Sequence, residues 1–196
     1  MQVLLLHTLN FMEERKIITG NTEQEIWDQV SQDLTASEDS LTYDVLINQN
    51  GKQIELDIDI DLGGGFEGGS ATTQLSAPLR VTRDFRFALH DQDFLDTIGK
   101  FFALEDIVLG YPEFDEHVVV KTNAREKVSE LFADRAVRDV FTRLNDFDFG
   151  IHTRTPEDTD IEEPFLELNI NDAVTEPAAL RQIYHAFYAV LTGLEK

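Results

Sequence analysis

Apolar and acidic residues alternate on the two sides of an Asn-Gly pair, and this pattern constrains the fold more than any other feature. Tyr43, Val45 and Ile47 recur at every second position before Asn50-Gly51. The run after the pair has two faces, with Ile54, Leu56, Ile58 and Ile60 on one and Glu55, Asp57, Asp59 and Asp61 on the other. Asn-Gly favours a type I′ turn, in which both residues take positive φ. The segment therefore predicts a β-hairpin with one apolar and one acidic face.

The rest of the chain mixes strand and helix patterns without a βαβ alternation. The patterns predict strands at 70–77, 79–89, 115–121, 147–154 and 162–170. They predict a helix that starts within residues 21–25 and ends at about 36, and further helices at 92–103 after Asp91, at 124–132 after Asn123, at 134–144 from Asp134 and from Pro177 onward, with a weaker helical pattern at 3–16. This order indicates the α+β class: antiparallel β-sheet with helices packed on one face, including a helix pair at about 124–144 and a C-terminal amphipathic helix. We expect a single domain over 1–196; the alternative is a two-part organisation with a seam near 104–112.

The charge balance limits the choice of partner. The chain has 38 acidic and 16 basic residues, which gives a formal net charge of −22. A surface this negative repels nucleic-acid phosphates and anionic lipid head groups, so we expect no nucleic-acid partner and no membrane partner. Two interpretations stay open: the charge maintains solubility, or it attracts a cation or a protein with a basic surface.

The sequence lacks the residues that several kinds of chemistry require. The sequence has no cysteine, which excludes disulfides, thiolate catalysis and zinc–sulfur sites. It contains no H-E-x-x-H, G-x-S-x-G or Walker A motif, so we expect no cofactor. No stretch approaches the ~20 apolar residues of a membrane span. The apolar residues 3–6 follow no basic residue, which is unlike a signal peptide. We therefore expect a cytoplasmic protein.

Gly63, Gly65 and Gly68 match the dinucleotide-binding pattern G-x-G-x-x-G. That mechanism needs a helix after the glycines, whose N-terminus faces the pyrophosphate. Residues 70–75 instead favour a strand, and the acidic strand before the glycines would repel phosphate. We interpret the segment as a flexible or bulged loop, which could still close over a ligand.

The start of a calcium-binding loop has the same spacing of acidic residues as Asp57, Asp59 and Asp61. An EF-hand also needs Gly at its sixth position and a bidentate Glu at its twelfth, where this chain has Leu62 and Gly68. The period of two places all three carboxylates on one strand face. That face either collects a divalent cation or is an ordinary solvated strand face.

His152 is the histidine most suggestive of a site. It shares a predicted strand face with Asp148 and Arg154, and the strand at 162–170 would bring Glu167 and Asn169 nearby. A His, a carboxylate and an Arg could perform acid–base chemistry on an anion. The alternative is a mixed-charge sheet face in which charges pair across strands.

One segment resembles a known family. Residues 104–154 contain a Gly and a Phe-Asp pair before a hydrophobic strand, followed by a helix pair and another strand. The matching residues are Asp106, Gly110, Phe114, Asp115, Val118, Val120, Leu131 and Val140. This stretch resembles a segment of a bacterial protein family of unknown function, so the resemblance implies no activity and no catalytic residue. The physical interpretation of Phe114-Asp115 is structural: the ring packs, and the carboxylate caps a turn.

The order of predicted elements is also loosely similar to that of small acidic chaperones that hold bacterial secretion substrates. Those chaperones are shorter and lack the helix pair at 124–144. Our leading hypothesis is a non-enzymatic cytosolic binding protein with a basic protein partner, and a homodimer is compatible with it. The rival is a small-ligand binder or hydrolase-like enzyme with a site near Gly63–Gly69 or on the face of His152, Arg154 and Glu167. A concave site lined by convergent polar groups would favour the rival.

Overall fold

The computed structural model describes residues 15–36, 40–64, 68–80, 84–91, 104–155 and 162–195. Within them, nine strands form one sheet in the order β1-β2-β3-β4-β9-β8-β5-β7-β6. The strands are β1 (Lys16–Gly20), β2 (Thr42–Gln49), β3 (Lys52–Asp61), β4 (Ser70–Pro78), β5 (Phe87–Asp91), β6 (Glu105–Ile107), β7 (Val118–Thr122), β8 (Phe147–Arg154) and β9 (Glu163–Ile170). The helices are α1 (Glu23–Ala36), α2 (Pro112–His117), α3 (Arg125–Leu131), α4 (Arg135–Arg143) and α5 (Pro177–Leu194). β1 and β2 are parallel and the other described pairs are antiparallel, so the α+β prediction is confirmed.

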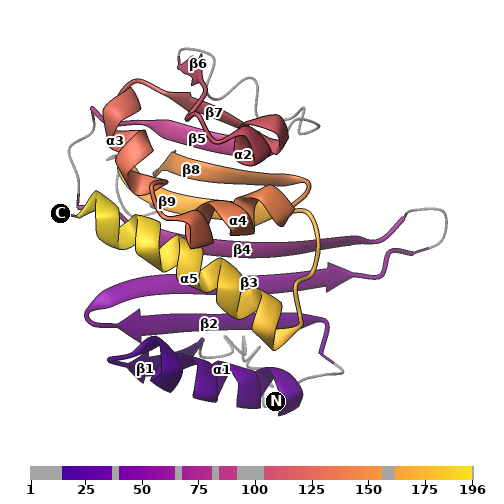
Figure 1. Ribbon diagram of the computed structural model, residues 1–196. Helices are drawn as coiled ribbons and strands as arrows, with labels where there is room; N and C mark the ends of the chain where they lie inside the picture. Colours follow the sequence, from indigo (N-terminus) through magenta and orange to yellow (C-terminus); the bar gives the residue numbers. More distant parts are fainter. Residues whose placement is uncertain are drawn as a thin grey trace, which may run out of the picture.

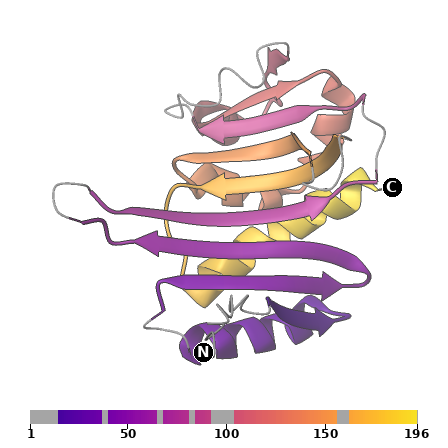
Figure 2. The same ribbon diagram turned by 180° about the vertical axis from the view of Figure 1, so that it is seen from behind.

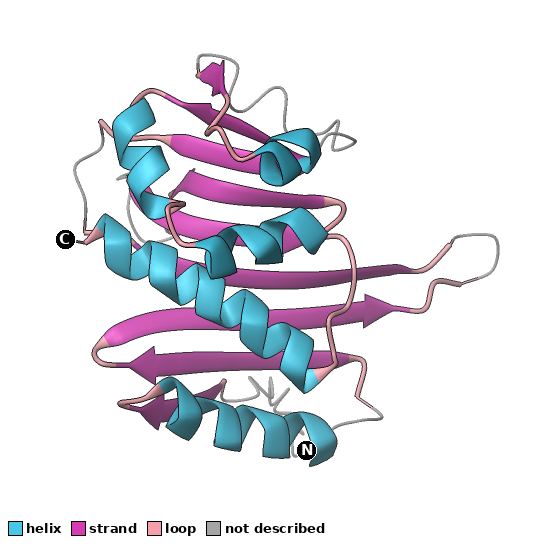
Figure 3. Cartoon of the chain, in the orientation of Figure 1, coloured by secondary structure: helices cyan, strands magenta, loops and turns pink. Residues whose placement is uncertain are grey.

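The described helices lie over one face of the sheet (Figure 1). α5 crosses the middle of the sheet, α1 lies beside β1 and β2, and α2, α3 and α4 lie over the other half (Figures 1 and 3). Seen from behind, the strands stand in front and no described helix covers them (Figure 2). We call this uncovered side the open face. Strands from both sides of residues 104–112 belong to the one sheet. None of the described helices has the length and hydropathy needed to cross a bilayer.

The hairpin of β2 and β3 forms as predicted. Asn50 and Gly51 both have positive φ, 53° and 77°, as a type I′ turn requires. Cross-strand pairing aligns Val45 with Leu56 and Ile47 with Ile54, and all four side chains are buried under the helices. The acidic residues between them therefore project from the open face.

β3 and β4 continue beyond their neighbours as a two-stranded arm (Figures 1 and 2). β2 pairs with β3 only as far as Asp59, and β9 pairs with β4 only from Thr73 onward. Asp61 and Ser70 therefore pair with each other alone. The described glycines that follow β3 and precede β4, Gly63, Gly64, Gly68 and Gly69, lie at the end of this arm, away from the centre of the sheet.

The two long helices start at residues that satisfy free backbone N–H groups. At α1, the Thr22 hydroxyl accepts from the Glu25 N–H at 3.2 Å, and the Glu25 carboxylate accepts from the Asn21 N–H at 2.8 Å. At α5, Pro177 occupies the first turn as predicted, and the Glu176 carboxylate caps the helix. The face of α5 toward the sheet is apolar and buried, with Leu180, Ile183, Tyr184, Phe187, Val190 and Leu191.

An aromatic cluster fixes the helices on the sheet around β8. Phe149 stacks on Phe141 of α4 with ring centroids 4.7 Å apart. It also contacts Phe87 of β5 at 5.8 Å and Phe187 of α5 at 6.0 Å. Because side chains alternate along a strand, this buried anchor directs the neighbouring residues of β8 to the open face.

Two predicted strands have other bounds in the structure. The strand expected at 79–89 is β5, Phe87–Asp91. The segment expected as a strand from 115 begins as α2, because Pro112 suits a first helical turn, and the strand follows as Val118–Thr122.

The predicted helix starts have mixed outcomes. Asp134 caps α4 as predicted and accepts from the Ala136 N–H at 2.8 Å. Asn123 does not cap α3; its side chain instead accepts from the Arg86 N–H at 2.9 Å. Asp91 belongs to β5 and accepts from the Asp146 N–H at 2.6 Å. The helices predicted at 3–16 and 92–103 lie outside the described residues, apart from the last two positions of the first, which are not helical.

Candidate functional site

The charged residues that the sequence singled out on β8 and β9 lie together on the open face. The Nε2 atom of His152 lies 3.0 Å from Oδ2 of Asp148, and its Nδ1 lies 3.9 Å from Oε2 of Glu167. Arg154 forms an ion pair with Glu167 through its Nε. Asn169 lies opposite Asp148, with its Nδ2 3.5 Å from Oδ2. The predicted juxtaposition is present, and its role in binding or catalysis stays a prediction.

The same network continues across the sheet to β3. Arg154 Nη1 lies 3.7 Å from Oε2 of Glu55, which also accepts a hydrogen bond from the Ser76 hydroxyl at 3.1 Å. On its other side, Glu55 Oε1 lies 2.8 Å from Arg15 Nη1. Positive and negative groups thus alternate across the strands, which is the arrangement that balances charge on a sheet face.

The carboxylates at the centre of this network are buried. Asp148 is 5% exposed and Glu167 is 7% exposed, and a buried carboxylate needs a cation or hydrogen-bond donors. A general acid or base must also reach the substrate proton. Here His152 pairs with Asp148, and Arg154 pairs with Glu167. The geometry therefore supports compensation of buried charge more directly than proton transfer to a substrate.

The β2–β3 half of the open face is acidic. We call Asp44, Glu55, Asp57 and Asp59 the acidic strip. Asp44 and Asp57 are direct cross-strand partners, and Asp59 is exposed. Burial, and then the charges of Asp44 and Asp59, raise the pKa of Asp57 above its ordinary value, although Arg15 acts in the opposite direction. Arg15 pairs with Asp44 and Glu55, and its charge does not offset the effects of burial and of the other carboxylates on Asp57.

The three aspartates predicted as a metal site share one face of β3. Asp57 pairs with Gln74, Asp59 with Thr72 and Asp61 with Ser70, so successive carboxylates stand one strand repeat apart. Asp61 already accepts a hydrogen bond from the Gly63 N–H at 2.9 Å. In the part of the chain that the structure describes, no three His, Asp or Glu side chains gather closely enough to hold a metal ion.

The described glycines of the predicted glycine loop lie at the far end of the β3–β4 arm. Gly63 and Gly68 lie there, and Gly65 lies outside the described residues. The strand β4 follows these glycines, so the helix N-terminus needed to bind a pyrophosphate is not at this position. Neither of the two pockets below is lined by Gly63 or Gly68.

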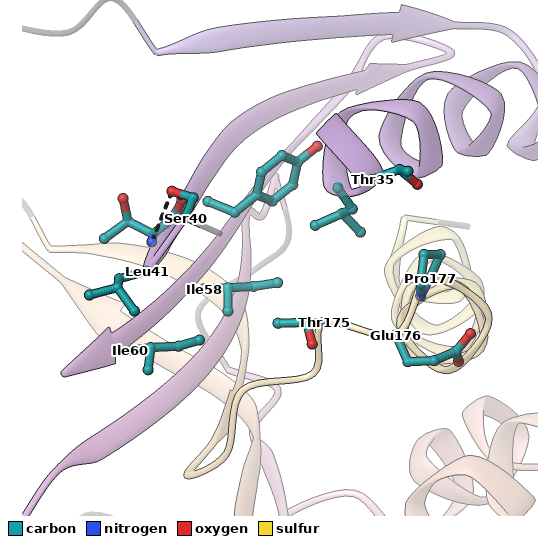
Figure 4. Close-up of a pocket in the computed structure, with 11 residues that line it drawn as sticks. Thr35, Ser40, Leu41, Ile58, Ile60, Thr175, Glu176 and Pro177 are labelled. Carbon is teal, nitrogen blue, oxygen red and sulfur yellow. Dashed lines mark hydrogen bonds between the residues drawn. The ribbon is translucent and has the colours of Figure 1, made fainter. Parts of the chain in front are cut away.

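A pocket of about 470 Å³ lies on the helix-covered side, between the end of α1 and the start of α5 (Figure 4). Its residues come from four segments: Leu34 and Thr35, then Ser40, Leu41, Thr42 and Tyr43, then Ile58 and Ile60, then Thr175, Glu176 and Pro177. Burial, and then the charge of Asp33, raise the pKa of Tyr43, so its hydroxyl stays protonated at neutral pH. The pocket is thus largely neutral, with Glu176 as its charged member.

A second pocket lies at the opposite end of the hairpin, between the Asn50-Gly51 turn and the end of α5. Lys52 and Arg80 line it, and Lys52 forms an ion pair with Glu195. Burial, and then the charge of Arg80, lower the pKa of Lys52.

Sequence analysis missed both pockets because their residues are far apart along the chain. The first combines positions 34 and 177, and the second combines positions 50 and 195. A weak signal for the first was available: Ile60 continues the apolar face of the hairpin, and an apolar face needs cover.

No protein-family model matches the sequence, and no curated protein matches it significantly. The resemblance of residues 104–154 to a bacterial family therefore stays a prediction.

Proposed function

We propose that this chain is a cytosolic, non-enzymatic binding protein whose open face binds a protein with a basic surface. The acidic strip is the observation that carries the proposal. Asp44 and Asp57 stand directly opposite each other with Asp59 beside them, and like charges in such positions destabilise a sheet. A partner that brings Lys or Arg side chains to the strip would remove this repulsion.

Apolar side chains beside the acidic strip support the same proposal. Ile17 is the cross-strand partner of Leu46 at the β1 edge of the open face, and it is 64% exposed. Protein interfaces commonly combine an apolar centre with a polar, charged rim. Ile17 and the strip together offer both parts within three neighbouring strands, β1, β2 and β3.

The charge also bears on the kind of partner. A second copy of this chain would bring the same acidic strip, so contact through this face would repel. We therefore propose a different, basic protein as the partner on the open face, and a homodimer would have to use another surface. A role like that of the secretion chaperones is a narrower form of this proposal, supported by the order of elements alone.

The test is capture of partners by the immobilised full chain from a lysate of the source cells. The face variant carries Asp57→Lys and Asp59→Lys. The matched control carries Glu126→Lys and Glu130→Lys, which make the same change in net charge at exposed positions of α3 on the helix-covered side. We expect wild type and control to retain the same basic proteins and the face variant to lose them.

A second pair of variants separates specific contact from general charge attraction. Ile17→Ser removes the exposed apolar side chain beside the strip. Val108→Ser removes one that is 58% exposed and follows β6, the strand at the opposite edge of the sheet. Loss of capture with Ile17→Ser but not with Val108→Ser would support the proposal. Equal capture by all variants would contradict it.

A further inference from the structure

β1 forms one edge of the sheet. It stands first in the strand order, and β2 is its only neighbour among the described strands. Figures 1 and 2 show it at the end of the sheet, with α1 beside it. An edge strand presents backbone N–H and carbonyl groups that no neighbouring strand satisfies, so it can pair with another chain. The opposite edge is shorter: β6 has three residues and β1 has five.

A hydrogen bond from α1 identifies the outward-facing backbone groups of β1. The side-chain amide of Gln29 donates to the Thr19 carbonyl at 3.1 Å. A side-chain donor of this kind satisfies a carbonyl that points away from the neighbouring strand. Backbone groups point to alternate sides along a strand, so the N–H and carbonyl of Ile17 face the same way as those of Thr19. The Ile17 side chain is 64% exposed, so an added strand would meet apolar surface next to these backbone groups.

The part of α1 that borders this edge is acidic. At the start of β1, Lys16 forms an ion pair with Asp33 of α1. At the end of β1, Gly20 has no side chain, and a Cβ atom there would lie 3.4 Å from Oε2 of Glu25. Glu25 is exposed and accepts from the Asn21 N–H, and it forms no ion pair with the cations of the described residues. A basic residue placed beside Gly20 would therefore meet a carboxylate that no cation neutralises.

We propose that the basic partner binds through an extended segment that adds a strand beside β1, with an apolar residue next to Ile17 and a basic residue next to Gly20. These two positions are three residues apart, so they lie on opposite faces of the sheet, and the segment alternates apolar and basic residues. In such strand addition, backbone hydrogen bonds supply affinity and alternate side chains supply specificity. The inference rests on the proposed function, because it names the form in which that partner binds.

The test uses a synthetic peptide of alternating Lys and Val, acetylated and amidated at its ends, in titrations of the isotope-labelled full chain followed by NMR. The control peptide has the same composition with its lysines in one block, so the charge is equal but no strand face is purely apolar. We expect the alternating peptide to bind about ten-fold or more tightly and to slow hydrogen exchange of the Ile17 and Thr19 amides. Equal affinity of the two peptides, or unchanged exchange of these amides at saturation, would overturn the proposal.

Other occupants of the edge give a different result in the same experiment. If the Ile17 and Thr19 amides are already protected in the free chain at every protein concentration, the chain itself covers the edge. If their protection rises with protein concentration, a second copy covers it. Either result would overturn the proposal.

Two substitutions at one position test the backbone contact. Ile17→Pro removes an outward N–H group, and edge strands tolerate proline where the N–H faces solvent. Ile17→Thr keeps the N–H and the β-branched shape. We expect Ile17→Pro to weaken binding of the alternating peptide by about ten-fold or more, and Ile17→Thr to weaken it less. Wild-type affinity in folded Ile17→Pro would overturn the assignment. If Ile17→Pro does not fold, the comparison of the two peptides on the wild-type chain decides the matter.

Failure of this inference can be told apart from failure of the proposed function. Partner capture that is unchanged by Asp57→Lys and Asp59→Lys contradicts binding at the acidic strip. Equal affinity of the two peptides contradicts the added strand and leaves capture through the strip intact.

Discussion

Asp44 on β2 and Asp57 on β3 are direct cross-strand partners, and both carboxylates project from the open face. Arg15 lies 2.6 Å from Asp44 and 2.8 Å from Glu55, so it bridges two members of the acidic strip. The pKa of Asp57, the partner of Asp44, is raised by burial first and then by the charge of Asp44. In the free protein, the carboxylate of Asp57 is therefore repelled by the other carboxylates of the acidic strip.

Replacing Asp57 by Asn should stabilise the protein at neutral pH. The pKa of Asp57 in the folded state lies above its ordinary value of 3.8, so the folded state binds this proton more tightly than the unfolded state. The negative charge of Asp57 lowers the free energy of unfolding by its full amount at pH values above the folded-state pKa. Below the unfolded-state pKa, Asp57 is protonated in both states and the effect disappears. We expect Asp57→Asn to raise the free energy of unfolding by about 0.2–1 kcal/mol at neutral pH, the range for cross-strand charge pairs.

The gain from Asp57→Asn should shrink as the pH falls through this window, as measured by urea unfolding at several pH values. The control is Asp59→Asn, which removes the same charge from an exposed position opposite Thr42 and Thr72. Its effect should be the smaller of the two. A gain from Asp57→Asn that persists unchanged at acidic pH would show that repulsion is not its cause.

Replacing Glu23 by Gln should loosen the contact between α1 and α5. Burial raises the pKa of Glu23, but hydrogen bonds from His185 and Arg181 outweigh burial and lower it. The stabilisation is therefore present above the ordinary pKa of 4.5 and lost as the pH falls through the lower folded value. Because the pair is partly exposed, we expect Glu23→Gln to cost about 0.2–1 kcal/mol at neutral pH and less in acid.

The control for Glu23→Gln is Glu126→Gln, since Glu126 also occupies the first turn of a helix. Both changes remove the same favourable interaction with the helix dipole. Only Glu23→Gln should show a cost that depends on the ion pairs with Arg181 and His185. If the two variants lose the same stability in thermal unfolding, the loss in Glu23→Gln comes from the helix dipole alone.

Replacing Asp115 by Ala should destabilise the turn before α2. Its carboxylate accepts hydrogen bonds from the N–H groups of Leu109 at 2.9 Å, Gly110 at 2.8 Å and Tyr111 at 2.8 Å. Hydrogen bonds to a charged group are worth about 1.5–3 kcal/mol, and three donors would lose their acceptor together. We expect a loss of about 2–4 kcal/mol in urea unfolding. Asp139→Ala, at a half-exposed position of α4, should cost far less.

The Phe114-Asp115 pair also shows what the sequence could predict. The ring is buried and the carboxylate caps a turn, as expected. The cap was predictable because it involves residues within a few positions. The hairpin at Asn50-Gly51 and the helix starts at Asp134 and Pro177 were predictable for the same reason. In contrast, the start of β7 was misplaced because α2 is short, and the valines that follow it have a strong strand preference that masks the boundary.

The candidate sites also differ in whether local sequence patterns could predict them. His152, Arg154 and Glu167 could be placed together because the alternation of two adjacent strands sets their face. The pocket of Leu34, Ile60 and Glu176 depends instead on where α1 and α5 lie over the sheet. Helix positions follow from packing of the whole core, such as the rings around Phe149, and no local pattern in the sequence specifies them.

Gly150 is required by the close approach of β5 to β8. A Cβ atom at this position would lie 2.4 Å from the Phe87 carbonyl oxygen and 3.0 Å from the Ala88 Cα. Both are backbone atoms that cannot move without disturbing the β5–β8 ladder. Crowding of this kind costs about 1–3 kcal/mol or more, so we expect Gly150→Ala to lower the free energy of unfolding by at least that amount.

Gly64→Ala is the matched control for Gly150→Ala, because a Cβ atom at Gly64 would meet no atom within 4 Å. It should leave stability nearly unchanged in urea unfolding. Since Asp148 and His152 lie on either side of Gly150, displacement of β8 should also separate their side chains, which are 3.0 Å apart in the wild type. NMR chemical shifts of the His152 ring in the two variants would detect this: a change in Gly150→Ala alone is expected. Unchanged shifts together with unchanged stability would mean that the two strands can move apart at no cost.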